Sequence, residues 1–193
     1  MKVSIIGQGY VGLTISAFAA AEHDVVGFDN SQRVVNQLNK GISHIEGVDS
    51  EVIARWAKAG RYRATTSGAE IKGSDIVVIA VPTPLTSDRK PDLVFIDAAC
   101  KTIGENITKP VLVINESTSF PGTIRNYIKP MIEKLSPSAI EHEYAISPER
   151  VDPGRVDWDQ KNTPRLYAGL TPTASKRTRD FYTTFCEIGR AHV

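Results

Sequence analysis

The sequence is poor in features that would each point to a particular class of protein. Its 193 residues hold only two cysteines, Cys100 and Cys186, and their wide spacing is typical of reduced thiols in a cytoplasm rather than of a disulfide framework. The formal net charge is +1, which indicates neither a nucleic-acid-binding surface nor an acidic tail. No apolar run approaches the roughly 20 residues of a membrane span, and no cleavable signal precedes the first apolar segment. We therefore expect a cytoplasmic protein with no nucleic-acid partner and no membrane partner.

Metal-ligand patterns are also lacking. The four histidines show no ligand spacing, and we interpret them as surface or structural residues. What is present is a globular mixture of 41% hydrophobic and 23% charged residues, which is enough to bury a core. The length suits one good domain and the start of a second.

A glycine motif stands between two apolar runs near the start of the chain. Residues 3–6 are typical of a short buried strand, and residues 11–21 predict a helix. Between them lie Gly7, Gly9 and Gly12, in the spacing of a dinucleotide-binding turn. The first glycine permits the tight turn, the second removes the Cβ that would block a pyrophosphate, and the third lets the helix pack close to the strand. Helix N-terminal amides then face the phosphates.

An acidic residue completes this pattern. Residues 24–28 predict a second strand, and Asp29 ends it, 17 residues past Gly12. A carboxylate at this place accepts hydrogen bonds from ribose hydroxyls and repels a 2′-phosphate, which favours NAD over NADP. The helix before this strand lacks a terminal glycine, so Glu22 or His23 is expected in the left-handed conformation if the helix ends in the common way.

The rest of the chain alternates strands with helices. The expected further strands are 63–66, 75–81, 110–114, 144–146 and 166–170, and the expected further helices are 31–39, 51–59, 93–103, 123–135 and 173–185. This alternation predicts an α/β fold: a doubly wound, mostly parallel Rossmann-type sheet with helices on both faces. Three unusual loops, "VPTPL", "NESTSFPGT" and "SPERVDPGR", each follow a predicted strand. They should therefore meet the glycine turn at the carboxyl edge of the sheet, where such folds bind ligands.

The ordered set of motifs resembles the UDP-glucose/GDP-mannose dehydrogenase family over residues 1 to about 186. The set is "GQGYVG", "GFD", "LNKG", "VIAVPTPL", "PDL", "NESTSFPGT" and "SPERVDPG". The "SPER" form resembles the branch that acts on UDP-N-acetylglucosamine or UDP-N-acetylmannosamine. The resemblance implies an oxidoreductase of polysaccharide biosynthesis that oxidises the C6 alcohol of a UDP-sugar to a carboxylate with two NAD. It also implies a homodimer or higher homo-oligomer for the full-length enzyme.

The fingerprint and the resemblance together imply a set of site residues. The cofactor would be held by Gly7, Gly9, Tyr10, Val11, Gly12, Asp29, Val81, Pro82, Thr83 and Thr118. Thr118 would also hydrogen-bond a water near the reacting carbon. Glu149 would act as an acid/base or position water for hydrolysis of a thioester, and with Arg150 and Val151 it would touch the sugar nucleotide.

Each of these roles has a purely structural alternative. Thr83 is then a cap between two prolines, Thr118 a satisfied turn hydroxyl, and Glu149 with Arg150 a solvated ion pair.

Some of the chemistry that the resemblance implies needs residues that this sequence does not supply. The family uses a cysteine that captures the aldehyde, together with a lysine, an asparagine and an aspartate beyond the nucleotide-binding domain. Cys100 lies in a predicted helix, and Cys186 closes what resembles the last helix of the cofactor domain, so neither is expected to be the nucleophile. We therefore expect an NAD-binding domain at 1–186, without the central helix and the substrate domain, which is inactive alone.

The last seven residues, "EIGRAHV", no longer resemble the family. One of their codings, GAG ATC GGA AGA GCA CAC GTC, matches a common sequencing-library adapter. We expect 187–193 to be a non-native tail, and the alternative is a genuine chain end. Three functions stay open: part of a UDP-N-acetylhexosamine 6-dehydrogenase, part of a UDP-glucose 6-dehydrogenase, or a stand-alone NAD-binding module without catalysis.

Overall fold

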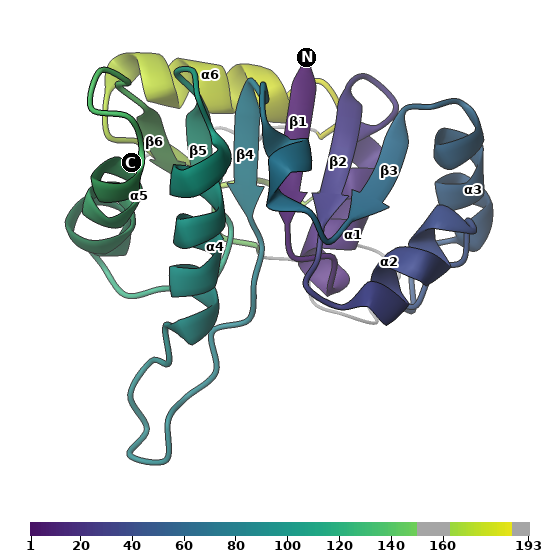
Figure 1. Ribbon diagram of the computed structural model, residues 1–193, viewed down its shortest axis with the longest axis horizontal. Coiled ribbons are helices and arrows are strands. Elements are labelled where there is room, and N and C mark those ends of the chain that lie inside the picture. Colours follow the sequence, from purple (N-terminus) through teal and green to yellow (C-terminus); the bar gives the residue numbers. More distant parts are fainter. Residues whose placement is uncertain (150–162, 187–193) are drawn as a thin grey trace.

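A computed structural model describes residues 1–149 and 163–186, which form a seven-stranded sheet between layers of helices (Figure 1). The strand order is β3-β2-β1-β4-β5-β6-β7; the first six strands are parallel, and β7 runs antiparallel to β6. The strands are β1 (Lys2–Ile6), β2 (Asp24–Phe28), β3 (Tyr62–Thr65), β4 (Ile76–Ile79), β5 (Leu112–Asn115), β6 (Glu143–Ile146) and β7 (Ala168–Gly169). The predicted doubly wound fold is therefore confirmed.

Helices cover both faces of this sheet. They are α1 (Tyr10–Ala19), α2 (Gln32–Asn39), α3 (Ser50–Lys58), α4 (Val94–Asn106), α5 (Lys129–Leu135) and α6 (Pro172–Tyr182). A short 3₁₀ helix, Gly68–Ile71, precedes β4. Side chains of a strand point alternately to opposite faces, so Ile76 and Val78 of β4 join a core with α1 and α6, whereas Val77 and Ile79 join a second core with α4 and α5. No helix in the described ranges is long and apolar enough to span a membrane.

The order of strands creates the binding edge. Strand β1 pairs with β2 on one side and with β4 on the other, so the chain winds outward in both directions from this point. In open α/β sheets a crevice forms at such a switch point, outside the carboxyl ends of the strands. The glycine turn after β1 and the loop after β4 therefore meet there.

Local sequence accounts for several element ends. Ser31 caps α2, as predicted: its side chain accepts a hydrogen bond from the backbone N–H of Val34. Helix α1 does not end in the common left-handed way, because neither Glu22 nor His23 has a positive φ. Instead, the N–H of Glu22 donates to the carbonyl of Ala19 at 3.1 Å, and a tight turn closes the helix without strain.

Two further differences have physical causes. The single helix expected over 123–135 begins as a π-helical turn, Ile124–Ile128, and only then becomes α5. Pro130 lies in the first turn of α5, where its missing N–H and its ring disfavour a continuous α-helix. The strand expected at 166–170 is reduced to two residues that pair antiparallel with β6.

Candidate functional site

The glycine turn between β1 and α1 combines a structural glycine with an open one. Gly7 has φ +91°, and its N–H donates to the carbonyl of Phe28 at 2.8 Å. A Cβ on Gly12 would lie 1.8 Å from the carbonyl oxygen of Gly7, so only glycine allows this approach of helix to strand. A Cβ on Gly9 would meet no atom within 4 Å. Gly12 is therefore needed by the fold, while Gly9 faces open space.

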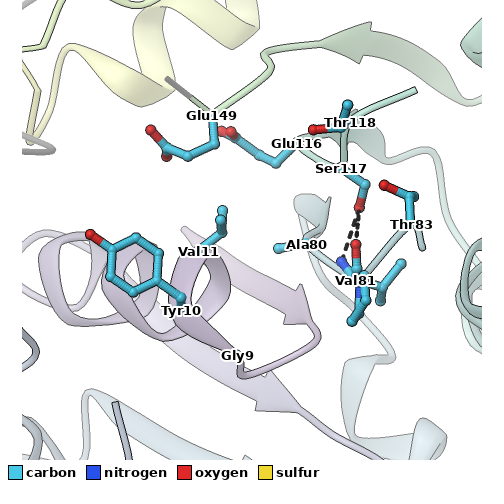
Figure 2. Close-up of a pocket in the computed structure, with 11 residues that line it drawn as sticks. Gly9, Tyr10, Val11, Ala80, Val81, Thr83, Glu116, Ser117, Thr118 and Glu149 are labelled. Atoms are coloured by element: carbon cyan, nitrogen blue, oxygen red, sulfur yellow. Dashed lines mark hydrogen bonds between the residues drawn. The ribbon is translucent and has the colours of Figure 1, made fainter. Parts of the chain in front are cut away.

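Two cavities meet at this turn, of about 350 Å³ and about 290 Å³. Both are lined by Gly9, Ala80, Val81 and Pro82, so they form two ends of one groove across β1 and β4. The larger is also lined by Ile6, Gly7, Phe28, Asp29, Asn30, Val34, His44, Phe95, Ala98, Ala99 and Thr102. The smaller is also lined by Tyr10, Val11, Thr83, Glu116, Ser117, Thr118 and Glu149 (Figure 2).

Asp29 lines the larger cavity and also hydrogen-bonds the glycine turn. One carboxylate oxygen, Oδ2, accepts a hydrogen bond from the N–H of Gln8 at 2.9 Å, and the other accepts from Ser31 at 2.8 Å. Each carboxylate oxygen has a second lone pair, so both retain capacity for a ligand hydroxyl. His44 contributes a buried Nδ1 that has no hydrogen-bond partner among the described residues. These groups fit the ribose end of a dinucleotide.

The loops after β4 and β5 are tied together at the smaller cavity. The hydroxyl of Ser117 accepts from the N–H of Val81 at 3.0 Å and donates to the carbonyl of Val81 at 2.8 Å (Figure 2). This pair of bonds holds the backbone that leads into Thr83. Thr118, next to Ser117, is exposed at the rim. The loops after β4 and β5 and the described start of the loop after β6, at Glu149, thus converge at the glycine turn.

A buried charge cluster lies behind this rim. Glu116 directly follows β5, and its Oε1 accepts from Arg165 at 2.7 Å and from the hydroxyl of Tyr182. Arg165 also donates to Oε2 of Glu149 at 3.2 Å, and its guanidinium carbon lies 4.4 Å from the centre of the Tyr182 ring. The side chains of Glu116 and Arg165 are 0% and 5% exposed. Burial raises the pKa of Glu116 to about 7, although Arg165 and Tyr182 act in the opposite direction.

The structure places the predicted residues as follows. The smaller cavity is lined by Gly9, Tyr10, Val11, Val81, Pro82, Thr83, Thr118 and Glu149. The larger cavity is lined by Gly7 and Asp29, together with Gly9, Val81 and Pro82. Gly12 packs behind the turn. Arg150, Val151 and the tail 187–193 lie outside the described residues.

Neither cysteine lines either cavity. Burial raises the pKa of the Cys100 thiol to about 12 and also raises that of Cys186, so neither is an activated thiolate. Within the described part of the chain, no cluster of His, Cys, Asp or Glu has the arrangement of a metal site. His44, interpreted from sequence as surface or structural, instead lines the larger cavity.

Sequence reasoning missed Glu116, Arg165 and Tyr182. A signal for Glu116 did exist, because it is an acid that immediately follows a buried strand within "NESTSFPGT". Arg165 carried no local signal: its carboxylate partners Glu116 and Glu149 are 49 and 16 residues away, and only the fold brings them together.

Comparisons with known proteins agree with this geometry. The NAD binding domain of the UDP-glucose/GDP-mannose dehydrogenase family matches residues 1–186. The chain is 34% identical over 195 residues to the UDP-N-acetyl-D-mannosamine dehydrogenase of Escherichia coli K12, covering 96% of this chain and 46% of that protein. It is 34% identical over 193 residues to the NDP-N-acetyl-D-galactosaminuronic acid dehydrogenase of Ralstonia solanacearum, covering 95% of this chain and 45% of that protein. The chain therefore spans about half the length of the curated relatives it matches.

Solved structures show the same similarity. The UDP-D-ManNAc dehydrogenase of Pyrococcus horikoshii has a TM-score of 0.89 at 32% identity, covering 97% of this chain and 46% of that one. The UDP-glucose dehydrogenase of Pyrobaculum islandicum also reaches 0.89, at 27% identity, covering 97% of this chain and 45% of that one.

Proposed function

Because the chain belongs to the UDP-glucose/GDP-mannose dehydrogenase family, as an NAD binding domain of that family, we propose that it is the cofactor half of a nucleotide-sugar 6-dehydrogenase. The proposed reaction is oxidation of the C6 alcohol of a UDP-N-acetylhexosamine to the uronate with two NAD. The observation that carries the proposal is the single groove that joins Asp29, the glycine turn, the loops after β4 and β5, and Glu149 after β6. Relatives named UDP-N-acetyl-D-mannosamine dehydrogenase support this choice of sugar.

The two cavities of the groove suit different halves of NAD. In dinucleotide-binding folds the acid at the end of the second strand binds the ribose next to the adenine. Asp29 and His44 lie at the larger cavity, so the adenosine half belongs there. The nicotinamide half then belongs in the smaller cavity, beside Thr83, Thr118 and Glu149. The open space at Gly9 leaves room for the pyrophosphate between the two.

The residues of the smaller cavity are suited to handling a proton next to a hydride transfer. NAD supplies the chemistry of accepting a hydride when it is bound. Glu149 is a half-buried carboxylate at the rim, held by Arg165 at 3.2 Å, and it is placed to accept a proton from an alcohol or to orient a water. Thr118 presents an exposed hydroxyl that can bind the same water.

We infer that neither cysteine of the chain is the nucleophile that captures the substrate. Both cysteines of the chain are buried, and neither lines the groove. We therefore expect the chain to bind NAD without completing the oxidation. With NAD and UDP-N-acetyl-D-mannosamine, it should form no NADH by absorbance, and sustained NADH formation would contradict this part of the proposal.

The cofactor site is tested by calorimetric titration of the chain with NAD and NADP. We expect NAD to bind and NADP to bind more weakly, because the Asp29 carboxylate repels a 2′-phosphate. D29N should weaken NAD about tenfold or more, since hydrogen bonds to a charged group contribute about 1.5–3 kcal/mol. The same change should reduce the preference for NAD over NADP.

The matched control is D24N, at the opposite end of β2, where the Asp24 side chain is 71% exposed and pairs with Arg61 at 3.4 Å. D24N should leave both affinities unchanged. Equal NAD binding by D29N and the unaltered chain would show that the groove is not the cofactor site.

A further inference from the structure

We propose that Glu116 holds a proton in the ligand-free protein and releases it when the positively charged nicotinamide ring of NAD⁺ enters the smaller cavity. This inference rests on the proposed function, because it takes the direction of the cofactor in the groove from it. The proton passes to the solvent, and no bond of the cofactor changes. Binding of NAD⁺ is then coupled to pH through Glu116, whereas binding of NADH, whose ring is neutral, is not coupled to pH through this residue.

The first argument is the arrangement of hydrogen bonds around Glu116. Oxygen Oε1 accepts from both Arg165, at 2.7 Å, and the hydroxyl of Tyr182. Oxygen Oε2 is buried and has no hydrogen-bond partner among the described residues. An ionised carboxylate needs donors on both oxygens when it is buried. A proton on Oε2 removes the charge, so the unpartnered oxygen costs less free energy, and it leaves the two bonds to Oε1 intact.

The second argument is the balance of charge in the cluster. Arg165 is one cation bonded to two carboxylates, Glu116 and Glu149. Among the residues that the structure describes, the other groups named beside the cluster are neutral in their ordinary states: Tyr182 and Cys186 from α6 and its end, Ser147 from the loop after β6, and Tyr10 across the cavity on α1. Within the described part of the chain, Glu116 and Glu149 thus share one cation, Arg165.

Burial decides which carboxylate takes the proton. The Glu116 side chain is 0% exposed and that of Glu149 is 11% exposed, so the desolvation cost of a charge is higher at Glu116. Burial and the like charge of Glu149 both raise the pKa of Glu116, which reaches about 7. A group that titrates near 7 is half protonated in neutral solution and responds strongly to a new charge.

The third argument is the place of Glu116 relative to the ligand. Figure 2 shows Glu116 and Glu149 on one side of the cavity, with Val11 and Tyr10 of α1 across from them. The nicotinamide end of the cofactor belongs in this cavity because Asp29 lies at the other end of the groove. A cation near a carboxyl favours the ionised form and lowers its pKa. The pyridinium ring therefore expels the proton that Arg165 alone does not expel.

The test is calorimetric titration of the whole 193-residue chain with NAD⁺ and with NADH at pH 7, in PIPES and in imidazole. These buffers differ in ionisation enthalpy, so the difference in measured heat gives the number of protons released. If the ring lowers the pKa of Glu116 by about one unit, NAD⁺ should release roughly 0.4 proton more than NADH. The same shift raises the ratio of the NAD⁺ affinity to the NADH affinity about fivefold between pH 6 and pH 8.

Comparison of the two cofactors removes other sources of protons. Both carry the same adenosine and pyrophosphate, so any response of His44 in the larger cavity is common to both and cancels. This measurement needs no variant, and it stands even if changes in the buried cluster impair folding.

Two Glu→Gln variants then locate the proton. E116Q should abolish the difference between NAD⁺ and NADH. E143Q should preserve it, because Glu143 also pairs with an arginine, Arg177, but at the start of β6, away from both cavities.

The outcomes separate the role of Glu116 from the proposed cofactor site. Equal proton release by NAD⁺ and NADH, with both binding, would overturn the role of Glu116 and leave the cofactor site standing. A difference that persists in a folded E116Q would overturn it as well. Failure of both cofactors to bind the folded chain would overturn the cofactor site and this inference together.

Discussion

Gly9 and Gly12 belong to one motif, yet the structure gives them opposite relations to their surroundings. A side chain at Gly12 would collide with the carbonyl of Gly7, whereas one at Gly9 would project into empty space. Gly9 also has φ −73° and ψ −162°, which any residue adopts without strain. Gly12 therefore serves the packing of α1 on β1, and Gly9 serves access to the groove.

Substitution at these two glycines should separate folding from binding. G9V should retain the melting temperature of the unaltered chain and lose NAD affinity by at least tenfold, since its side chain occupies the groove. G12A should lower the melting temperature sharply, because a contact of 1.8 Å with backbone forces the helix away from the strand. Thermal unfolding and NAD titration of both variants check this prediction. A G9V protein that binds NAD normally would contradict the proposed place of the pyrophosphate.

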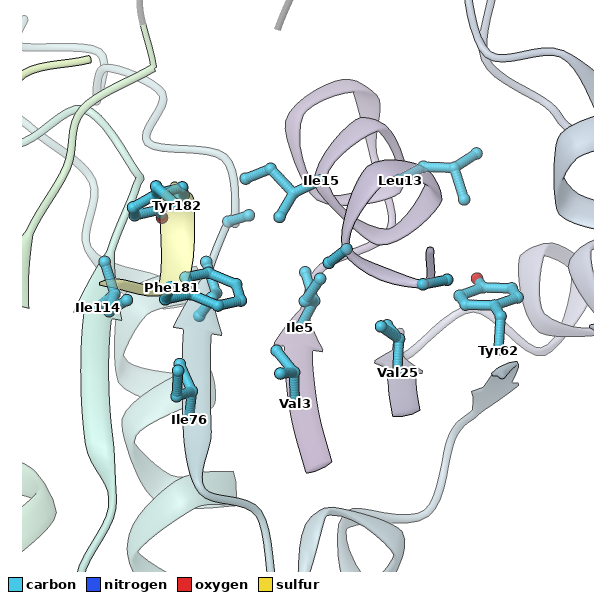
Figure 3. Packing of buried hydrophobic residues seen from close by; sticks show 14 of the residues in the cluster. Val3, Ile5, Leu13, Ile15, Val25, Tyr62, Ile76, Ile114, Phe181 and Tyr182 are labelled. Carbon is cyan, nitrogen blue, oxygen red and sulfur yellow. The ribbon is translucent and has the colours of Figure 1, made fainter. Parts of the chain in front are cut away.

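Helix α6 connects the core to the site at the scale of secondary-structure elements. Phe181 and Tyr182 are both 0% exposed, and their ring centres lie 4.8 Å apart (Figure 3). Phe181 packs in the core with Val3, Ile5 and Ile76 of the sheet, while Tyr182 donates to Glu116. The N-cap hydroxyl of Thr171, which accepts from the N–H of Ala174 at 3.0 Å, starts the helix. One helix thus anchors on the sheet and orients the charge cluster.

The anchoring residue should be costly to truncate. F181A should lower the free energy of unfolding by about 3–5 kcal/mol, because it leaves a cavity between α6 and the sheet. F120A is the matched control: Phe120 is 45% exposed in the loop after β5, and its truncation should cost less than about 1 kcal/mol. Urea unfolding followed by circular dichroism measures both. Similar losses in the two variants would show that α6 is not a principal anchor of the fold.

For the whole molecule, the pH dependence of the unfolding free energy is the sum of opposing contributions from buried titratable groups. Burial lowers the pKa of His23 and His142, so each stabilises the fold above its ordinary value of 6.5 and loses this contribution as the pH falls. The raised pKa of Glu116 acts in the other direction. Its protonated form stabilises the fold fully below the ordinary value of 4.5, and this contribution is lost as the pH rises to about 7. The buried histidines and Glu116 thus oppose one another near neutrality.

Removal of the Glu116 carboxyl should change the pH dependence of the unfolding free energy. Between pH 5 and pH 8, the unaltered chain should lose up to about 3 kcal/mol of unfolding free energy relative to E116Q, from one pKa shift of the size given above. E143Q should follow the unaltered chain, since the partly exposed Glu143 does not share the buried cluster. Urea titrations at a series of pH values measure the difference. Parallel curves for E116Q and the unaltered chain would mean that Glu116 is ionised throughout this range.

The sequence by itself determined the fold class, the order of elements and the cofactor, because these depend on local periods and spacings. The run at 24–28, the cap at Ser31 and the glycine spacing are each readable within a few residues. The convergence of three loops also followed from local information, since parallel strands place their carboxyl ends at one edge.

Only the tertiary structure decided the charge cluster behind that edge. Glu116 and Arg165 are 49 residues apart, and Glu116 and Tyr182 are 66 apart. No local pattern encodes such pairs, because contact and burial exist only after the sheet, the segment before β7 and α6 have packed. The pKa of Glu116 depends on that burial and on its neighbours' charges. An acid in a loop motif thereby becomes a group that titrates near neutrality, since the fold removes its water and places a shared arginine beside it.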